Sequence, residues 1–450
     1  MKRNILAALI GVCFAAPAFA QSNVTMYGIM DAGVHVMDNG NGTKTKLVSG
    51  IADGSRIGFK GTEDLGGGFK AIFNIEARVE LDTGNNRAGY LSDEMNLPLV
   101  RGLNFAALGP AAAAPLAAAA QGAALQVASA GSTFPGQTQP YVVNQNGALF
   151  DRTSMVGLIT PVGAVLAGRM YTPGYEILAA ADPFETGTAG AWGTLTGGAP
   201  GFLAAGVAIR SDKSIQYRIQ LPNGVGASVM YGFRNSGYAG LDKKFWGVNV
   251  KYKANGADVG VGYNHGTDQN GDRGLISWTV GGSYEIGDMK FFAGYHDMEN
   301  ENSVIIPLLV AGWNTNVAPA LAAAAAPFGP IGAQLVNGYT TAFTDAVRAN
   351  LLLDATSWTV GMHYRVGAGR IMGSVNHVND RTAFNADATQ YSLGYDHNLS
   401  KRTDIYTVFT IINNKNSAQY AAGAASAPGG LTSAAGEDAK ALQVGIRHRF

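Results

Sequence analysis

The chain ends on Leu442-Gln443-Val444-Gly445-Ile446-Arg447-His448-Arg449-Phe450, a stretch in which apolar and polar residues alternate. One face carries the apolar residues Leu442, Val444, Ile446 and Phe450, and the other carries Gln443, Gly445, Arg447 and Arg449. Successive side chains of a β-strand point to opposite faces, so this period of two predicts a strand. A frayed terminus in water gains little from an aromatic ring, whereas a terminal strand that faces lipid has a use for it. We therefore expect a sheet that is closed within a membrane.

The amino-terminal residues predict export. Lys2 and Arg3 precede an apolar stretch, residues 5–14, and Ala18-Phe19-Ala20 forms a small-residue cleavage site before Gln21. This pattern is typical of a secretory signal peptide and is too short for a membrane anchor. We expect residues 1–20 to be removed and residues 21–450 to form a single domain. Cys13 is the only cysteine and lies in the expected signal peptide, so we expect no disulfide in the processed chain.

Composition narrows the class of protein further. Without Lys2 and Arg3 the chain has 30 basic residues against 32 acidic ones, a balance unlike the strongly basic surface of a nucleic-acid-binding protein. Glycine is frequent, with 61 residues, as expected for many strands and tight turns. The best apolar run, residues 105–130, is mostly alanine and is interrupted by Pro110 and Pro115, so it fails as a helical span of ~20 residues.

Alternation along the processed chain predicts an all-β fold, a transmembrane barrel of sixteen antiparallel strands. Each segment is close to the ~9–11 residues that a tilted membrane strand needs. Every second connection is a tight turn, and the longest of the others are residues 82–148, 172–212, 299–354 and 413–438. Such asymmetry is typical of outer-membrane barrels, whose short turns face the periplasm. The expected strands are 24–36, 54–62, 69–81, 149–159, 164–171, 213–221, 225–233, 245–254, 257–265, 277–286, 289–298, 355–366, 370–379, 388–397, 403–412 and 439–450.

Aromatic residues recur at one spacing on three of these strands. Trp246, Trp278 and Trp358 lie near strand starts, and a tyrosine follows six residues later on the same face, at positions 252, 284 and 364. Apolar residues lie between each pair, and polar residues occupy the opposite face. This predicts a lipid-facing band anchored by aromatic side chains at the membrane interfaces. The alternative is a large soluble β-sandwich, which the export signal and Phe450 disfavour.

The expected number of strands predicts a water-filled channel. Barrels of eight strands are filled by side chains, whereas barrels of about 16–18 strands leave an aqueous lumen. The expected first strand begins four residues after the cleavage site, which leaves no room for a plug domain. Several residues expected to face inward are glycines, which cannot fill a wide lumen. They are at positions 247, 260, 262, 281, 361 and 445.

Three alanine-rich stretches fall in long connections, at residues 106–130, 318–333 and 421–435. We favour flexible external insertions for all three. Because alanine is the best helix former, short helices at the pore mouth are the alternative. Prolines at positions 110, 115, 319, 327 and 330 would limit such helices.

Several pieces of the chain together resemble the general porins of the Gram-negative outer membrane. They are Val24-Thr25-Met26-Tyr27-Gly28, the block of residues 55–66, Gly157-Leu158 with Gly168-Arg169-Met170-Tyr171, and Phe450. The resemblance spans nearly all of the processed chain, apart from the alanine-rich insertions and the oversized second loop. It implies a homotrimer of sixteen-stranded barrels in outer-membrane lipid. It also implies that the barrel-assembly machinery recognises Phe450.

The resemblance further implies a pore constriction. In the family, the third loop folds into the lumen, and its acidic residues face arginines on the barrel wall. Here the third loop is residues 172–212, in which Asp182 and Glu185 resemble the loop acids. The wall residues that match by position are Arg56, Arg152 and Arg210, with Glu76 and Arg169 as weaker candidates.

Alternation independently places Arg56 in the lumen. It shares a face with Gly58 and Lys60, opposite Ile57 and Phe59. An arginine on the lipid face at mid-bilayer would cost about 2–4 kcal/mol. Opposed rows of acid and base across a narrow lumen would set up a transverse field that favours small hydrated solutes over apolar ones.

We therefore expect a passive channel for small hydrophilic solutes and ions, without enzymatic activity, cofactor or metal. The seven histidines are scattered singly, and no nucleophile, base and orienting group or set of metal ligands can be assembled. Two alternatives stay open. One is a surface adhesin that uses the alanine-rich loops, and the other is a substrate-selective porin, for which a file of lumenal aromatics would be needed. The sequence does not give the sign of the ion selectivity.

Overall fold

In the computed structural model, the chain is described for residues 23–94, 106, 114, 117–118, 143–144, 147–196, 208–233, 244–303 and 306–450. The expected signal peptide, residues 1–20, and nearly all of the alanine-rich stretch 106–130 lie outside these ranges.

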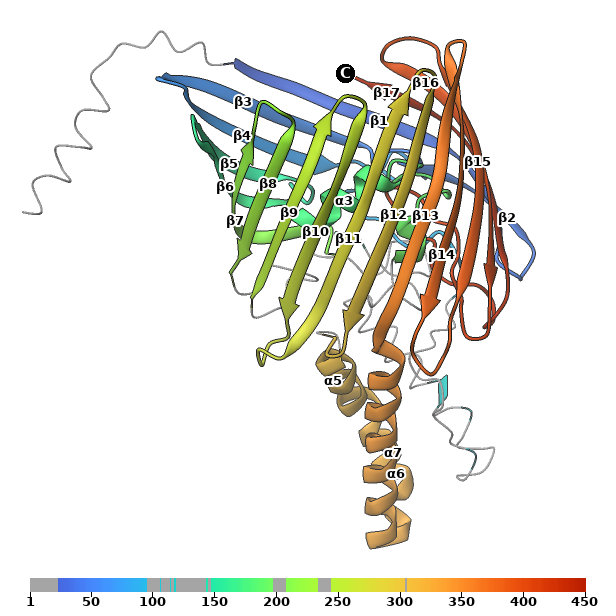
Figure 1. The fold of residues 1–450 in the computed structure, drawn as a ribbon. Helices are drawn as coiled ribbons and strands as arrows, with labels where there is room; N and C mark the ends of the chain where they lie inside the picture. Colours follow the sequence, from blue (N-terminus) through green and yellow to red (C-terminus); the bar gives the residue numbers. More distant parts are fainter. Residues whose placement is uncertain are drawn as a thin grey trace, which may run out of the picture.

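The described residues form one antiparallel β-barrel (Figure 1). The strand β1 pairs with β17 on one side and with β2 and β3 on the other, so the sheet closes into a barrel. The strands are β1 Asn23–Asp38, β2 Thr43–Ser49, β3 Arg56–Gly66, β4 Phe69–Arg78, β5 Ser154–Thr160, β6 Gly163–Tyr171, β7 Arg210–Gln220, β8 Val225–Gly232, β9 Phe245–Ala254, β10 Ala257–Thr267, β11 Arg273–Ile286, β12 Met289–Asn300, β13 Leu353–Val366, β14 Gly369–Asp380, β15 Ala388–Asn398, β16 Thr403–Asn414 and β17 Ala439–Arg449.

The predicted sixteen-stranded barrel is confirmed, because β2 and β3 are two halves of one barrel strand. β1 pairs with β2 through residues 32–38 and with β3 through residues 23–29. Between the two halves, residues 50–55 leave the sheet. They pass beside Asp31, a buried residue of β1. Its carboxylate accepts hydrogen bonds from the backbone N–H groups of Ile51 (3.2 Å), Ala52 (3.1 Å) and Asp53 (2.8 Å). Those donors would otherwise be unpaired at the break.

The carboxyl-terminal strand closes the barrel, as predicted. Beyond β17, the N–H of Phe450 donates to the carbonyl of Gly28, and the N–H of Gly28 donates back to Phe450, both at 3.1 Å. A Cβ at Gly28 would lie 2.4 Å from the Phe450 ring, so this close approach requires glycine.

The pattern of exposure along the strands is inverted relative to that of a soluble protein. On β13 the apolar residues Trp358 and Val360 are 38% and 55% exposed, whereas Thr359 and His363 on the other face are 1% and 4% exposed. Soluble proteins bury their large apolar side chains. The inversion matches a barrel whose outer face meets lipid and whose inner face is polar.

The three tryptophans lie on the outer face, near the long-loop ends of β9, β11 and β13, as predicted. Each contacts a ring on the following strand, with centroid distances of 5.1 Å for Trp246–Tyr263, 5.3 Å for Trp278–Tyr295 and 5.7 Å for Trp358–His377. This row of rings fits the predicted interfacial band.

One alanine-rich stretch is helical, so the flexible insertion that we favoured is wrong for residues 318–333. The helices are α5 Ile306–Asn316, α6 Ala318–Ala325, the 3₁₀ helix η4 Ala326–Phe328 and α7 Gly329–Leu351, and they project from the long-loop end (Figure 1). Pro319, Pro327 and Pro330 do not break them, because each lies in a first turn, where its missing N–H is not needed. Trp313 stacks on Phe343 at 4.3 Å and joins α5 to α7.

Of the described helices, none is by itself long and apolar enough to cross a bilayer. The bent pair Leu309–Ala323 and Ala326–Leu351 meets the length and composition criteria only jointly.

The stretch 421–435 is not a flexible external insertion either. It contains no helix, and Ala422 and Leu431 are only 1% and 2% exposed. Composition alone missed this, because an apolar segment without a period of two or 3.6 gives no sign of what it packs against.

The expected strand bounds agree within a few residues, with two exceptions. No strand was expected at β2, and β5 begins only at Ser154 instead of at residue 149. The carboxylate of Asp151 accepts hydrogen bonds from the N–H (3.1 Å) and the Nε (3.0 Å) of Arg78. It thereby takes a donor that a longer ladder between β4 and β5 would use.

Deletion of Phe450 removes two backbone hydrogen bonds and a ring contact at the closing seam. At roughly 0.5–1.5 kcal/mol for each hydrogen bond, the barrel loses about 1–3 kcal/mol. We expect the yield of inserted, heat-modifiable barrel to fall, while the conductance of each inserted channel stays at the parental value. A Phe450→Tyr variant is the control, since it keeps the backbone and the ring. Equal insertion of the deletion variant and the parent would contradict this assignment.

Candidate pore constriction

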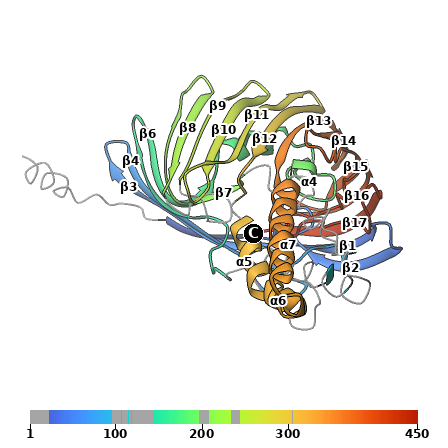
Figure 2. The ribbon, with the colours of Figure 1, turned by 90° about the horizontal axis from the view of Figure 1, so that it is seen from below.

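The third long loop, L3, connects β6 to β7 and folds back inside the barrel (Figure 2). It is described for residues 172–196 and 208–209 and contains α3 Pro173–Ala181 and α4 Gly193–Thr196. The Thr172 hydroxyl caps α3 by accepting the N–H of Tyr175. Asn264 of β10 fixes the same end, because its side chain donates to Thr172 Oγ1 (3.0 Å) and accepts from Gly174 N (3.1 Å).

The α3 helix of L3 packs against inward-facing glycines of the barrel wall. The sequence predicted that they point inward, which is correct, but the space beside them is occupied by the loop. A Cβ at Gly262 would lie 2.9 Å from Gly174 Cα, and a Cβ at Gly281 would lie 3.0 Å from Ala181 Cβ. Small residues on the wall therefore let the α3 backbone approach closely.

Asp182 follows α3 and is completely buried. Its carboxylate accepts hydrogen bonds from the N–H groups of Phe184 (2.9 Å), Trp192 (3.0 Å) and Thr186 (3.2 Å). Burial raises the pKa of this carboxyl group above its ordinary range. Asp182 therefore shapes the turn of L3 from within and has no surface on the lumen, where the sequence prediction placed it.

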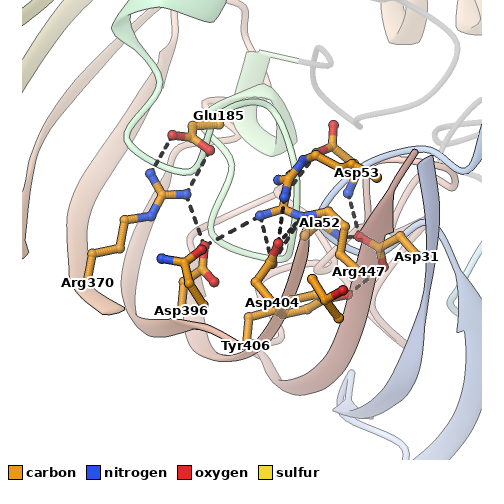
Figure 3. Close-up of polar contacts among 12 residues, drawn as sticks. Asp31, Ala52, Asp53, Glu185, Arg370, Asp396, Asp404, Tyr406 and Arg447 are labelled. Carbon is orange, nitrogen blue, oxygen red and sulfur yellow. Dashed lines mark hydrogen bonds and ion pairs between the residues drawn. The ribbon is translucent and has the colours of Figure 1, made fainter. Parts of the chain in front are cut away.

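Glu185, the second predicted loop acid, holds the tip of L3 against the wall (Figure 3). Its two carboxylate oxygens lie 2.6 and 2.9 Å from the guanidinium nitrogens of Arg370 on β14. Partial desolvation against the wall would raise the pKa of Glu185, whose side chain is 45% exposed, but the hydrogen bonds and charge of Arg370 outweigh this effect and hold the pKa near 2, below the ordinary 4.5. Within the described residues, neither Glu185 nor Asp182 pairs with Arg56, Arg152 or Arg210.

A chain of ion pairs continues from Arg370 around the wall (Figure 3). Arg370 lies 3.2 Å from Asp396, which lies 3.4 Å from Arg447. Arg447 also pairs with Asp404 at 2.9 Å and with Asp53 at 2.8 Å. Asp53 belongs to the break between β2 and β3, so the network joins the tip of L3 to that break.

The predicted wall arginines lie in a row along β3 to β7. Arg56 connects this row to the network, because it pairs with Asp53 at 3.1 Å. Glu76 of β4 joins two of them, with 2.6 Å to Arg152 and 3.8 Å to Arg56. Arg210 of β7 donates to the Tyr171 hydroxyl at 2.7 Å, and its guanidinium lies 4.4 Å from the centre of that ring. Arg152 and Arg210 are close enough to interact electrostatically. The structure therefore brings together Arg56, Glu76, Arg152 and Arg210.

This row carries more positive than negative charge. Within the described part of the chain, no carboxylate pairs with Arg210, and its Nε has no hydrogen-bond partner. Tyr171 stacks on Tyr175 of α3 at 5.2 Å, so Arg210 lies directly beside the start of L3. Arg169, the weaker candidate, pairs with Asp212 and donates to the carbonyl of Asp151 at 2.6 Å.

Sequence reasoning missed the residues that fix the tip of L3, namely Arg370, Asp396, Asp404, Arg447 and Asp53. Inward parity was an available signal for Arg447, which stands on the polar face of the last strand. The alternation of residues along a strand shows that a charged side chain faces the lumen. It does not show which residue of a distant strand pairs with that side chain.

Replacing Glu185 with glutamine removes the charge from the anchor of the L3 tip. We expect Glu185→Gln channels to show more open-channel current noise and to close at lower voltage, because the tip loses its ion pair with Arg370. Since the pKa of Glu185 is lowered, the anchor is complete above pH ~4.5 and is lost as the pH falls through about 2. The parent should therefore become noisy only at strongly acid pH.

The matched control for this experiment is Glu285→Gln, which removes an exposed ion pair with Arg365 at the short-turn end of β11. It should leave the noise unchanged. Identical traces from Glu185→Gln and the parent would contradict the anchoring role.

Comparisons with known proteins agree with this architecture. A family model described as Gram-negative porin matches residues 6–417. An outer membrane porin protein of Bordetella pertussis is 24% identical, and outer membrane porin protein 32 of Delftia acidovorans is 25% identical, each over 100% of both chains.

Solved structures share the fold. An anion-selective porin from Comamonas acidovorans aligns with a TM-score of 0.63 at 23% identity, covering 96% of this chain and 100% of the other. OmpT of Vibrio cholerae aligns with a TM-score of 0.53 at 12% identity, covering 95% and 98%. The chain belongs to the Gram-negative porin family and is a β-barrel protein of the outer membrane.

Proposed function

We propose that this porin is a passive diffusion channel for small hydrophilic solutes and ions, with a preference for anions set by Arg56, Arg152 and Arg210. The observation that carries the preference is the excess of positive charge in this row. Glu76 is shared by Arg56 and Arg152, and Arg56 also pairs with Asp53, a carboxylate that Arg447 shares. Arg210 pairs with no carboxylate among the described residues. Charged side chains at a narrow point are the usual device of ion selectivity.

The balance of charge elsewhere supports this choice of residues. Glu185 is paired with Arg370, and Glu176 of α3 is paired with Arg218 and lies 3.9 Å from Lys251. The acids of L3 are thus largely neutralised by the wall behind the loop. The arginine row then dominates the potential in the remaining lumen, which attracts anions. The relative from Comamonas acidovorans is named as anion-selective, which supports the same sign.

The assembly that we propose is a homotrimer surrounded by outer-membrane lipid and inserted by the barrel-assembly machinery. Membership of the porin family supports the trimer, and the exposed apolar outer face supports the lipid contact. We assign no catalytic role.

One specific observation supports the alternative function, that of a surface-binding barrel. The segment 306–351 forms helices that project from the long-loop end of the barrel and carries only two charged residues, Asp345 and Arg348. If this segment is the working part, its deletion should abolish binding to a target surface and leave conductance intact.

Planar-bilayer recording in a salt gradient tests the proposed channel. We expect conductance steps in groups of three and a reversal potential whose sign indicates anion preference. Arg210→Gln should shift the reversal potential toward zero, because it removes the arginine without a carboxylate partner.

The control is Arg365→Gln, which removes the same charge from an exposed site at the short-turn end of β13. It should produce a smaller shift, since it lies outside the row and is screened within ~10 Å at 0.1 M salt. A protein that inserts but does not conduct would refute the channel. Equal shifts from the two variants would refute the role of the row.

A further inference from the structure

The alanine-rich segment between β16 and β17 lies inside the mouth of the barrel. We call residues 418–432 the inner strap. It is buried along its length, with Tyr420 1%, Ala422 1%, Ser426 2% and Thr432 0% exposed. Tyr420 and Leu431 form a β-bridge that brings its two ends together. The strap is therefore a loop that leaves and returns at one point between β16 and β17.

Inward side chains of the barrel wall hold the inner strap. Arg78 of β4, only 6% exposed, donates from Nη1 to the carbonyl of Ser426 at 2.9 Å. Gln443 of β17 donates from Nε2 to the carbonyl of Gly423, also at 2.9 Å. These two anchors come from strands on different sides of β1. The strap therefore passes across part of the lumen on the inner side of the wall.

The inner strap and L3 share their anchors. The carbonyl of Ile51 accepts hydrogen bonds from Thr188 N of L3 (2.7 Å) and from Ala425 N of the strap (3.0 Å). Gln443 likewise accepts from Ala189 N of L3 at 2.6 Å while it donates to Gly423. One backbone carbonyl and one buried amide thus fix both segments in one arrangement.

The strap also reaches the arginine row. A Cβ placed on Gly54 would lie 2.7 Å from Arg152 Nη1 and 3.6 Å from Ser426 Oγ. Gly54 therefore lies beside both side chains. In contrast to L3, the strap contributes no charge, because residues 416–436 contain no Asp, Glu, Lys or Arg.

From these contacts we propose that the inner strap is a second, uncharged constriction in series with L3, and that it limits the size of the solutes that pass. The proposal rests on the proposed channel function and extends it. The arginine row sets the sign of the selectivity, whereas the strap sets steric access to the row. Gln443 and the Ile51 carbonyl make the two constrictions a single unit.

The test replaces residues 421–430 with Asn-Gly, a two-residue turn that suits the bridged residues Tyr420 and Leu431. If the strap and L3 contribute similar resistances in series, removing one raises the single-channel conductance by about twofold. Larger sugars should then enter proteoliposomes in a swelling assay, while the sign of the reversal potential stays the same.

The matched control deletes residues 306–351, the helices that project outside the barrel, and joins the ends with a short Gly-Ser linker. This removes more residues, but it should change neither conductance nor the size limit. Heat modifiability on gels verifies that each variant has inserted as a barrel.

A second variant, Gln443→Met, covers the case in which the strap deletion does not fold. It keeps the side-chain volume but removes the bonds to Gly423 and Ala189, so conductance and current noise should both rise. Parental conductance and size limit in the folded strap deletion, or in Gln443→Met if the deletion does not fold, would overturn the proposal. Failure of the parent itself to conduct would instead refute the channel function.

Discussion

The fold depends on one constraint, that every backbone N–H and C=O at membrane depth must be hydrogen-bonded within the protein, because lipid offers no partner. A sheet meets it only by closing, which β1 achieves by pairing with β17 and with both halves of the second barrel strand. Closure separates an outer face, which must be apolar, from an inner face, which is free to carry charge. The exposed Val360 and the buried Thr359 beside it show this separation within one strand.

Closure also decides what the loops can do. L3 packs inside the lumen against a wall that fits it. Glycines of the wall let α3 approach closely, and Asn264 binds the amino-terminal end of α3. Asp182 satisfies the backbone of the turn, and Glu185 holds its tip to Arg370. Since the acids of the loop are thus occupied, Arg210 stands beside L3 without a carboxylate partner in the described part of the chain. The proposed anion preference follows from this arrangement.

Sequence periodicity predicted the strands and the closing seam because a period of two is a local property of the chain. It also placed Arg56 correctly, since parity against Ile57 and Phe59 is local as well. The partner of Glu185 was beyond reach, because it depends on the path of L3 across the barrel to a strand 185 residues away. The break between β2 and β3 was missed because it depends on the carboxylate of Asp31, which binds three backbone N–H groups 20, 21 and 22 residues further along the chain. Alanine content suggested helices at 318–333 only as the alternative to a flexible insertion, and it did not predict the burial of 421–435.

The most direct measurement is chemical modification of an Arg210→Cys variant during single-channel recording, using a negatively charged, water-soluble thiol reagent. The only other cysteine, Cys13, lies in the expected signal peptide. If Arg210 lines a hydrated lumen beside L3, the reaction should lower the current and shift the reversal potential toward cations. The same reagent on Val360→Cys, on the outer face of β13, should change neither. An unaltered current and reversal potential after complete modification of Arg210→Cys, verified by mass spectrometry, would contradict the assignment.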